Sequence, residues 1–142
     1  MMIGTYEHRL DKKGRLVLPS KFRQELGDEL VASVGVEQCV SLYSKDGWEK
    51  LLERLQRMPF SRSKARDFLR VFLATAHELS VDSAGRILLP QMLKSHASLD
   101  SEVSVIGVGD HLEIWDRDIW NKYRQDILAN FPSIVEGVEW EK

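Results

Sequence analysis

LDKKGRLVLP, residues 10–19, returns 71 positions later as VDSAGRILLP, residues 81–90. Each copy contains an Asp-x-x-Gly-Arg motif, followed by three apolar residues and a proline. The similarity continues downstream at an offset of 72, as expected if one loop residue is inserted. Because the period is long and occurs only twice, it indicates an internal duplication with a pseudo-two-fold relation rather than a solenoid. The matched pairs include Glu7 and Glu78, Asp11 and Asp82, Val31 and Val103, Leu42 and Ile114, Tyr43 and Trp115, and Trp48 and Trp120.

Each copy of the motif predicts a β-hairpin followed by a short helix. Residues 5–10 alternate in polarity and residues 15–19 are mostly apolar, which is typical of two strands. Between them, residues 12–14 (Lys-Lys-Gly) suit a type I turn that ends in a glycine with positive φ, and Asp11 suits the first position of that turn. The proline that follows favours the start of a short helix, which would end at Gly27.

Both halves show the order hairpin, short helix, two strands and longer helix, which predicts an α+β fold built from two repeated units. Asp46 and Glu49 have the spacing of a capping box and are expected to begin the first longer helix. The expected strands cover residues 29–35, 39–44, 102–109 and 111–116, and the expected longer helices cover 46–58, 61–77 and 117–131. The predicted organisation is unit 1 at 5–47, linking helices at 48–75, unit 2 at 76–119, and a C-terminal helix with an acidic, loosely attached tail at 120–142.

Length and composition are those of one ordinary soluble globular domain. The 142 residues suffice for a shared core, whereas each half would be marginal alone. No apolar run approaches the roughly 20 residues of a membrane helix, and the N-terminal segment lacks the apolar region of a signal peptide. A single cysteine, Cys39, excludes an internal disulfide and suits a reducing compartment. We therefore expect a cytoplasmic protein with no membrane partner.

Charge is distributed unevenly along the chain, although the formal net charge is only −2. Residues 1–74 contain 14 Lys/Arg against 10 Asp/Glu, whereas residues 75–142 contain 6 against 12. Six of the bases lie within residues 9–23 and six more within residues 54–70. Such asymmetry is typical of a protein with an anion-facing surface and an acidic rear. For the cluster at 54–70, the ordinary alternative of a solvated helix surface is preferred.

In each predicted hairpin the aspartate and arginine of the motif face each other across the turn. Asp11 would cap the turn and hold Arg15 by a charge-assisted hydrogen bond, as Asp82 would hold Arg86. One alternative is that these pairs only stabilise their turns. A glycine-containing turn needs no arginine, however, and a surface ion pair contributes only about 0–1 kcal/mol of stability. The repeated arginine, accompanied by two lysines in the first copy, therefore favours binding of a planar anion such as a phosphate or a guanine edge.

The sequence contains none of the common catalytic motifs. It lacks the phosphate-binding G-x-x-x-x-G-K-[ST] loop, the C-x-x-C pair, the H-E-x-x-H zinc motif and the G-x-S-x-G nucleophile elbow. Its four histidines share no ligand spacing, and the acids of residues 110–118 lack the glycine and closing glutamate of an EF-hand loop. We predict a protein that is not an enzyme, with no metal, no cofactor and no small-molecule substrate.

Three segments resemble the MraZ family of bacterial transcriptional regulators: GTYEHRLDKKGRLVLPSKFR, FLRVFLATAHELSVDSAGRILLP and VSVIGVGDHLEIWDRDIWNKY. The resemblance runs from about residue 3 to residue 125 and includes both D-x-x-x-R motifs at the right separation. It implies two SpoVT/AbrB-like DNA-binding units in one chain and assembly into a closed homo-oligomeric ring. It also implies a nucleoid-associated repressor that binds double-stranded DNA at short direct repeats upstream of its own operon, the division and cell-wall gene cluster.

By this resemblance the DNA contacts lie in the first hairpin and extend to the second. The second turn carries Ser83 and Ala84 where the first carries two lysines, which weakens its case for DNA contact and leaves a role in subunit contacts open. The leading alternative function is a structural or interaction protein of the cell-division apparatus, and a small phospho-substrate enzyme ranks last. The implied DNA-binding residues are Arg15, Lys12, Lys13, Arg9 and Arg86, and the implied positioning residues are Asp11, Gly14, Asp82 and Gly85.

Overall fold

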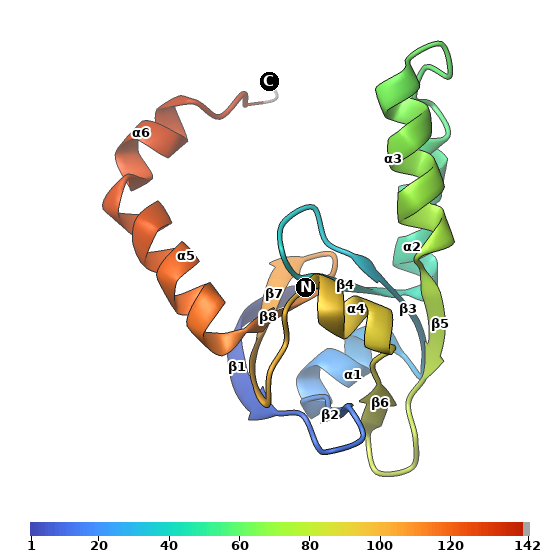
Figure 1. The fold of residues 1–142 in the computed structure, drawn as a ribbon, viewed down its shortest axis with the longest axis vertical. Coiled ribbons are helices and arrows are strands. Elements are labelled where there is room, and N and C mark those ends of the chain that lie inside the picture. The colour runs from blue at the N-terminus through green and yellow to red at the C-terminus, as the bar shows by residue number, and fades with distance from the viewer. Residues whose placement is uncertain (141–142) are drawn as a thin grey trace.

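A computed structural model describes residues 1–140, and Figure 1 shows a body of strands and short helices from which two helical arms extend. The combination of helices with antiparallel sheet confirms the predicted α+β class. The elements of the first half are β1 (Met2–Arg9), β2 (Arg15–Val17), α1 (Ser20–Leu26), β3 (Glu29–Val34), β4 (Val40–Ser44), α2 (Lys45–Leu55) and α3 (Ser63–Ala74). Those of the second half are β5 (His77–Ser80), β6 (Arg86–Leu88), α4 (Gln91–His96), β7 (Glu102–Gly109), β8 (Leu112–Asp116), α5 (Arg117–Ala129) and α6 (Phe131–Glu136).

The strand order relates the two halves by a pseudo-two-fold axis. The six-stranded sheet has the order β1-β7-β8-β4-β3-β5, and exchanging each strand for its repeat gives the same order in reverse. The second sheet is a ribbon of β2 and β6, in which Leu16 pairs with Ile87, its own equivalent in the repeat. In the larger sheet, Ser41 of β4 likewise pairs with its equivalent Glu113 of β8. The axis therefore passes through the centres of both sheets.

The turns of the two motifs form as predicted, but the strands beside them do not pair as hairpins. In the first turn the N–H of Asp11 donates to the carbonyl of Arg15, and that of Gly14 donates to the carbonyl of Asp11, both at 3.0 Å. β1 nevertheless pairs along its whole length with β7, β5 pairs with β3, and β2 pairs with β6. The predicted pairing was wrong because both halves repeat one polarity pattern, so local periodicity does not distinguish a partner in the same half from its equivalent in the other.

The helix ends follow local chemistry, with one correction. Gly27 ends α1 with a φ of +79°, as predicted. α2 is capped by Ser44, whose hydroxyl accepts a hydrogen bond from the N–H of Gly47, so the capping box predicted at Asp46 is not what begins this helix. The expected loose tail contains the short helix α6, and the last two positions of the predicted 120–142 segment lie outside the described residues.

The main apolar core lies between one face of the six-stranded sheet and a layer formed by the ribbon, α1 and α4. Leu16 and Ile87 on the pseudo-two-fold axis are 0% and 1% exposed, and the equivalent helix residues Phe22 and Leu93 are also buried. Because both halves contribute equivalent residues to one core, neither half has a core of its own. A smaller cluster on the other face of the sheet packs Trp115 against the start of α5.

The two arms are formed by α2 with α3 and by α5 with α6, and they leave the same side of the body (Figure 1). The root of the α2–α3 arm is a run of aromatic rings, with Tyr43 5.6 Å from Trp48 and Trp48 stacked 5.4 Å from Phe72. Both arms expose large apolar side chains along their outer lengths. Within residues 1–140, no helix has both the length and the apolar character needed to span a membrane.

Candidate nucleic-acid interface

The β2–β6 ribbon presents its two arginines on one outer face. Alternation along a strand buries Leu16 and Ile87 beneath the ribbon, so the residues on either side of them point outward. Arg15 lies opposite Leu88, two residues from Arg86, which makes the two arginines diagonal neighbours about 7–8 Å apart. The structure therefore brings together, on the pseudo-two-fold axis, two side chains that are 71 positions apart in sequence.

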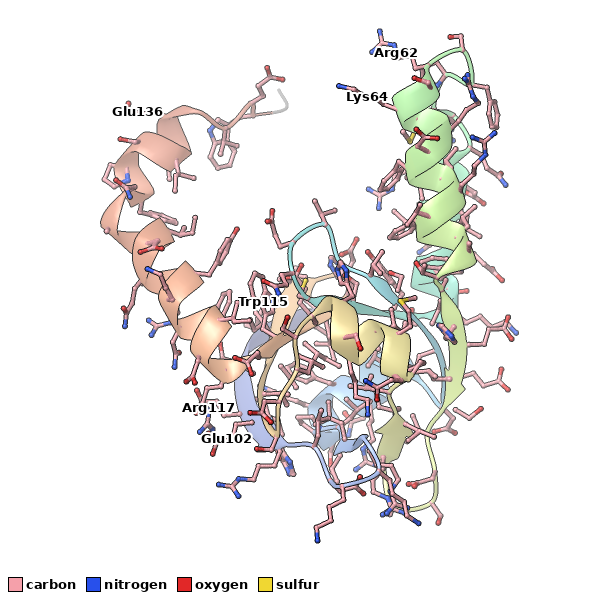
Figure 2. All side chains as sticks on the ribbon, viewed as in Figure 1. Arg62, Lys64, Glu102, Trp115, Arg117 and Glu136 are labelled. Atoms are coloured by element: carbon pink, nitrogen blue, oxygen red, sulfur yellow. The ribbon has the colours of Figure 1, made fainter. Side chains whose placement is uncertain are left out.

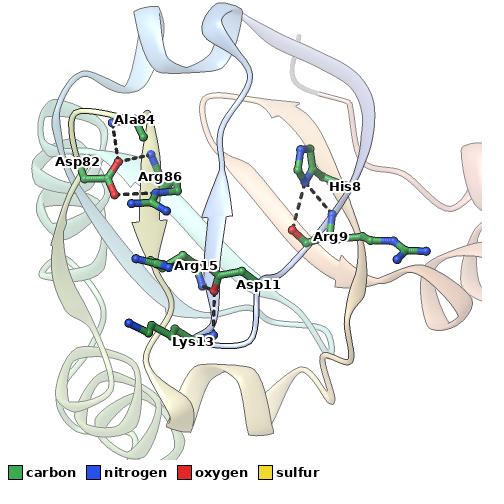
Figure 3. Close-up of polar contacts among 8 residues, drawn as sticks. All are labelled: His8, Arg9, Asp11, Lys13, Arg15, Asp82, Ala84 and Arg86. Atoms are coloured by element: carbon green, nitrogen blue, oxygen red, sulfur yellow. Dashed lines mark hydrogen bonds and ion pairs between the residues drawn. The ribbon is translucent and has the colours of Figure 1, made fainter.

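Each arginine is held by the aspartate that begins its own turn (Figure 3). One oxygen of Asp11, Oδ1, accepts hydrogen bonds from the N–H groups of Lys13 and Arg15, both at 2.9 Å. The other, Oδ2, accepts from Arg15 Nε at 2.6 Å. In the second turn, Asp82 makes the equivalent bonds with Ala84 and Arg86, all at 2.9 Å. The predicted aspartate–arginine pairs are thus present in both turns.

This grip leaves the outer edge of each guanidinium free. Only Nε of Arg15 and of Arg86 is engaged by the aspartate, and among residues 1–140 the terminal Nη1 and Nη2 atoms have no hydrogen-bond partner. These two nitrogens form the planar fork that donates in parallel to two oxygens of a phosphate, or to O6 and N7 of guanine in the major groove. The hydrogen bond from each Nε to its aspartate therefore fixes the guanidinium while leaving this fork without a partner in the turn.

The turn geometry lowers the pKa of both carboxyl groups. The backbone N–H of Arg15, followed by its guanidinium, lowers the pKa of Asp11 to about 2. The pKa of Asp82 is lowered as well, chiefly by the backbone N–H of Arg86. Both carboxylates are therefore fully ionised at neutral pH, when the arginines must be held.

We expect Asp11 to titrate near pH 2 in a carbon-detected NMR titration of the carboxyl group. Because its folded pKa lies below the ordinary 3.8, its contribution to stability is complete above the ordinary value and is lost as the pH falls through about 2. Replacing Arg15 by Gln should raise this pKa part of the way, since the backbone N–H remains. A midpoint near 3.8 in the wild type would show that the turn is not formed in solution.

Two basic residues that sequence reasoning did not assign to the site complete it. Gly14 and Gly85 have φ values of +83° and +78°, and a Cβ on either would lie 2.5 Å from Lys94 Nζ or 2.7 Å from Arg23 Nη1, respectively. Each turn is thus covered by a basic side chain that comes from the helix of the other half. The signal in the sequence is that Arg23 and Lys94 are themselves separated by the 71-residue repeat.

The predicted contact residue Arg9 lies apart from the other four. Its Nη2 lies 3.0 Å from Oε1 of Glu102, which Arg117 also approaches at 3.6 Å. Figure 3 shows the Arg9 side chain directed away from both turns, whereas Lys13 lies on the first turn beside Arg15. A lysine or arginine already paired in this way adds little net charge to a phosphate-binding face.

The net positive charge of the face comes from residues other than the two arginines. Asp11 offsets Arg15 and Asp82 offsets Arg86. The basic residues around the turns that form no ion pair within residues 1–140 are Lys12, Lys13, Arg23 and Lys94. Chemically, the arginines can contact an anion with defined geometry, and the unpaired bases can attract a polyanion.

The second basic cluster, at residues 54–70, lies on the α2–α3 arm and does not extend this face. Figure 2 places Arg62 and Lys64 at the outer end of that arm, and Figure 1 shows the ribbon on the opposite side of the body. Two of its members, Arg54 and Arg70, approach Asp110 and Asp67 at 3.9 and 3.4 Å. Over the described part of the chain, no three His, Cys, Asp or Glu side chains gather into a group that could hold a metal ion.

Comparison with known proteins identifies similar chains over almost the whole length. The family described as "MraZ protein, putative antitoxin-like" matches twice, at residues 1–71 and 72–136. A "Transcriptional regulator MraZ" from Caldanaerobacter subterraneus subsp. tengcongensis is 41% identical over 139 residues, covering 98% of this chain and 97% of its own. The proteins of the same name from Alkaliphilus metalliredigens and Heliobacterium modesticaldum are 42% identical over 139 residues (98% and 97% covered) and 41% identical over 136 residues (96% and 95% covered).

Proposed function

This chain belongs to the MraZ family, and from that premise we propose that it is a DNA-binding transcriptional regulator that contacts the duplex with the outer face of its β2–β6 ribbon. The observation that carries the proposal is the pair of arginines, each gripped at Nε by an aspartate and each with a free Nη fork. The unpaired bases around the turns supply the sequence-independent attraction that DNA binding requires. The relatives are named as regulators and not as enzymes, which supports a role without catalysis.

From the family to which the chain belongs, we further propose that its target is a set of short direct repeats upstream of its own operon, the division and cell-wall gene cluster, at which it represses transcription on the nucleoid. One ribbon offers few contacts, and specific protein–DNA interfaces usually bury about 1,000–2,500 Å² of protein surface. Affinity would therefore come from several protomers that occupy several repeats at once, because linkage raises the effective concentration of each ribbon.

The two arms support assembly of copies into a ring. On the α2–α3 arm, residues 54–70 carry six bases against one acid, whereas the outer part of the other arm, residues 125–140, carries three acids and no base. The bases Arg117, Lys122 and Arg124 lie on the inner part of that arm. The arms of one chain stand apart (Figure 1), so the complementary surface for each arm is the other arm of a neighbouring copy. Contacts of this head-to-tail kind form a ring when the rotation from one copy to the next closes, and we propose that it does so here. The large apolar side chains that they would cover are Phe60, Phe68, Val71, Leu73, Leu128, Phe131, Ile134, Val135, Val138 and Trp140.

We expect Phe131→Asp to reduce an assembly much larger than a dimer to smaller species. Phe131 begins α6 and is 49% exposed in the single chain, so a charge there would face the apolar residues of a neighbouring arm. Central aromatic residues of interfaces typically contribute about 2 kcal/mol or more, which corresponds to roughly thirtyfold in subunit affinity. Light scattering after gel filtration measures the change, and Val36→Asp, on a loop outside both arms, is the control. A wild type that is monomeric at micromolar concentration would contradict the assembly.

The function is tested by titrating a fluorescent duplex from the protein's own upstream region at several salt concentrations. We expect binding that weakens steeply with salt and that exceeds binding to a scrambled duplex, as specific complexes do. The alternative of a structural protein of the division apparatus predicts no preference between the two duplexes. Equal affinity for the two duplexes would therefore refute the proposal that the protein is a sequence-specific regulator.

A further inference from the structure

The two turns are equivalent in geometry but not in charge. They have the same carboxylate hydrogen bonds, and the φ values of their glycines differ by only a few degrees. Arg15 and Arg86 are equivalent to each other, and so are the covering bases Arg23 and Lys94. Three lysines of the first half, however, have uncharged equivalents at the offset of 71. The pairs are Lys12 and Ser83, Lys13 and Ala84, and Lys21 and Met92.

This difference matters because of where the pseudo-two-fold axis lies. The axis passes between Leu16 and Ile87 and runs perpendicular to the ribbon, as the two-fold of an antiparallel pair does. The backbone of B-DNA has two-fold axes perpendicular to its own axis, and a protein with matching symmetry reads a palindrome. If its two turns were chemically equal, one protomer would therefore bind a repeat equally well in either orientation.

Resting on the proposed function, we propose that Lys12 and Lys13, set against Ser83 and Ala84, determine the orientation of each protomer on its DNA repeat. The lysines of the first turn donate to guanine edges on one side of the axis. When the protomer is reversed they meet other bases, and the uncharged turn cannot replace the lost contacts. A base contact contributes about 1–3 kcal/mol of discrimination, so reversal should lower affinity by roughly five- to 150-fold for each such contact that is lost. Lys12 and Lys13 thus give a nearly symmetric protomer one preferred direction along the DNA. A direct repeat requires such a direction because all of its copies point the same way, whereas a palindrome does not.

The orientation is measured with a DNA-cleaving iron chelate attached to one cysteine at a time. Cys39 is fully buried, so labelling is confined to an introduced thiol at Ser20→Cys or at its equivalent Gln91→Cys. The probe is a duplex with a single repeat, so contacts between neighbouring protomers cannot impose an orientation. In an otherwise wild-type chain we expect each label to cut one flank of the repeat, and the two labels to cut opposite flanks.

Two variants then make the turns alike in opposite ways. Ser83→Lys/Ala84→Lys gives both turns lysines and should raise affinity and steepen its dependence on salt. Lys12→Ser/Lys13→Ala removes the lysines and should lower affinity and flatten that dependence. Despite these opposite shifts, both variants should cut both flanks about equally. The control Val36→Lys adds a charge on an exposed loop outside the ribbon and should leave one-sided cutting unchanged.

The outcomes separate this inference from the function on which it rests. One-sided cutting that persists in both double variants would overturn the role of the lysines, as would two-sided cutting by the wild type. If the wild type instead fails to prefer the duplex from its own upstream region, with all of its repeats, over a scrambled one, the proposed function fails and not the orientation alone.

Discussion

Arg15→Ala should nearly abolish specific DNA binding while the fold and the assembly persist. The side chain lies on the outer face of the ribbon, is 32% exposed and donates its hydrogen bond to Asp11 of its own turn, so its loss leaves the apolar core intact. A contact from an arginine fork to a base edge contributes about 1–3 kcal/mol of discrimination. Because every protomer on the DNA loses the contact, the losses of binding free energy add across the repeats, and the factors by which affinity falls multiply.

The measurement is the affinity for the repeat duplex over a range of salt, with particle mass determined in parallel. A contact to phosphate would also reduce the slope of log affinity against log salt by about 1 for each arginine lost. Arg86→Ala should weaken binding less, because its turn has no accompanying lysines. Arg9→Ala serves as the matched control, since Arg9 is paired with Glu102 and directed away from the turns. An Arg15→Ala protein that binds like the wild type, or that fails only because its assembly has dissociated, would refute the role assigned to Arg15.

Asp11→Ala should weaken binding by a different route. It removes the acceptor of three hydrogen bonds that close the turn, so the first turn loses order and its arginine loses its orientation. The melting temperature should therefore fall together with DNA affinity, whereas for Arg15→Ala only the affinity falls. Equal melting temperatures for Asp11→Ala and the wild type would show that the carboxylate does not hold the turn.

The second large effect is expected when the chain is divided between Thr75 and Ala76. Neither half should fold as a monomer, because β1 pairs with β7, β5 pairs with β3, and the ribbon takes one strand from each half. Leu16 and Ile87 would both lose the partner that buries them, and losing a fully buried aliphatic side chain from a core typically costs about 2–5 kcal/mol. The loss of unfolding free energy for a separate half is many times larger, since all of its core contacts to the other half disappear.

Circular dichroism and light scattering on the separate and mixed halves test this expectation. Mixed at equal concentration, the halves should regain strand signal and associate one to one, as binding that is coupled to folding requires. A half that does fold alone should do so only as a dimer that supplies its own missing strands. A cooperatively folded monomer of residues 1–75 would show that the exchange of strands is not needed for stability.

The sequence by itself determined the features that depend on neighbouring residues. The aspartate turn, its glycine with positive φ and the arginine held by Asp11 all follow from hydrogen bonds between residues no more than four positions apart. The end of α1 at Gly27 and the internal duplication could also be predicted, because a glycine after a helical segment and a repeated motif are both recognisable in short stretches of sequence. In the same way, the pairing of Asp82 with Arg86 could be predicted from the first copy.

Only the tertiary structure decided which strand lies beside which, and therefore which bases surround the turns. β1 and β2 are joined by one tight turn yet lie in different sheets, since burial of the shared core favours partners from the other half. That exchange places Lys94 over Gly14 and Arg23 over Gly85, and it directs Arg9 toward Glu102 instead. Because the two halves share one polarity pattern, each strand has two locally equivalent pairing partners, one in its own half and one in the other. Long-range packing selects between these partners, and no short stretch of sequence shows that packing.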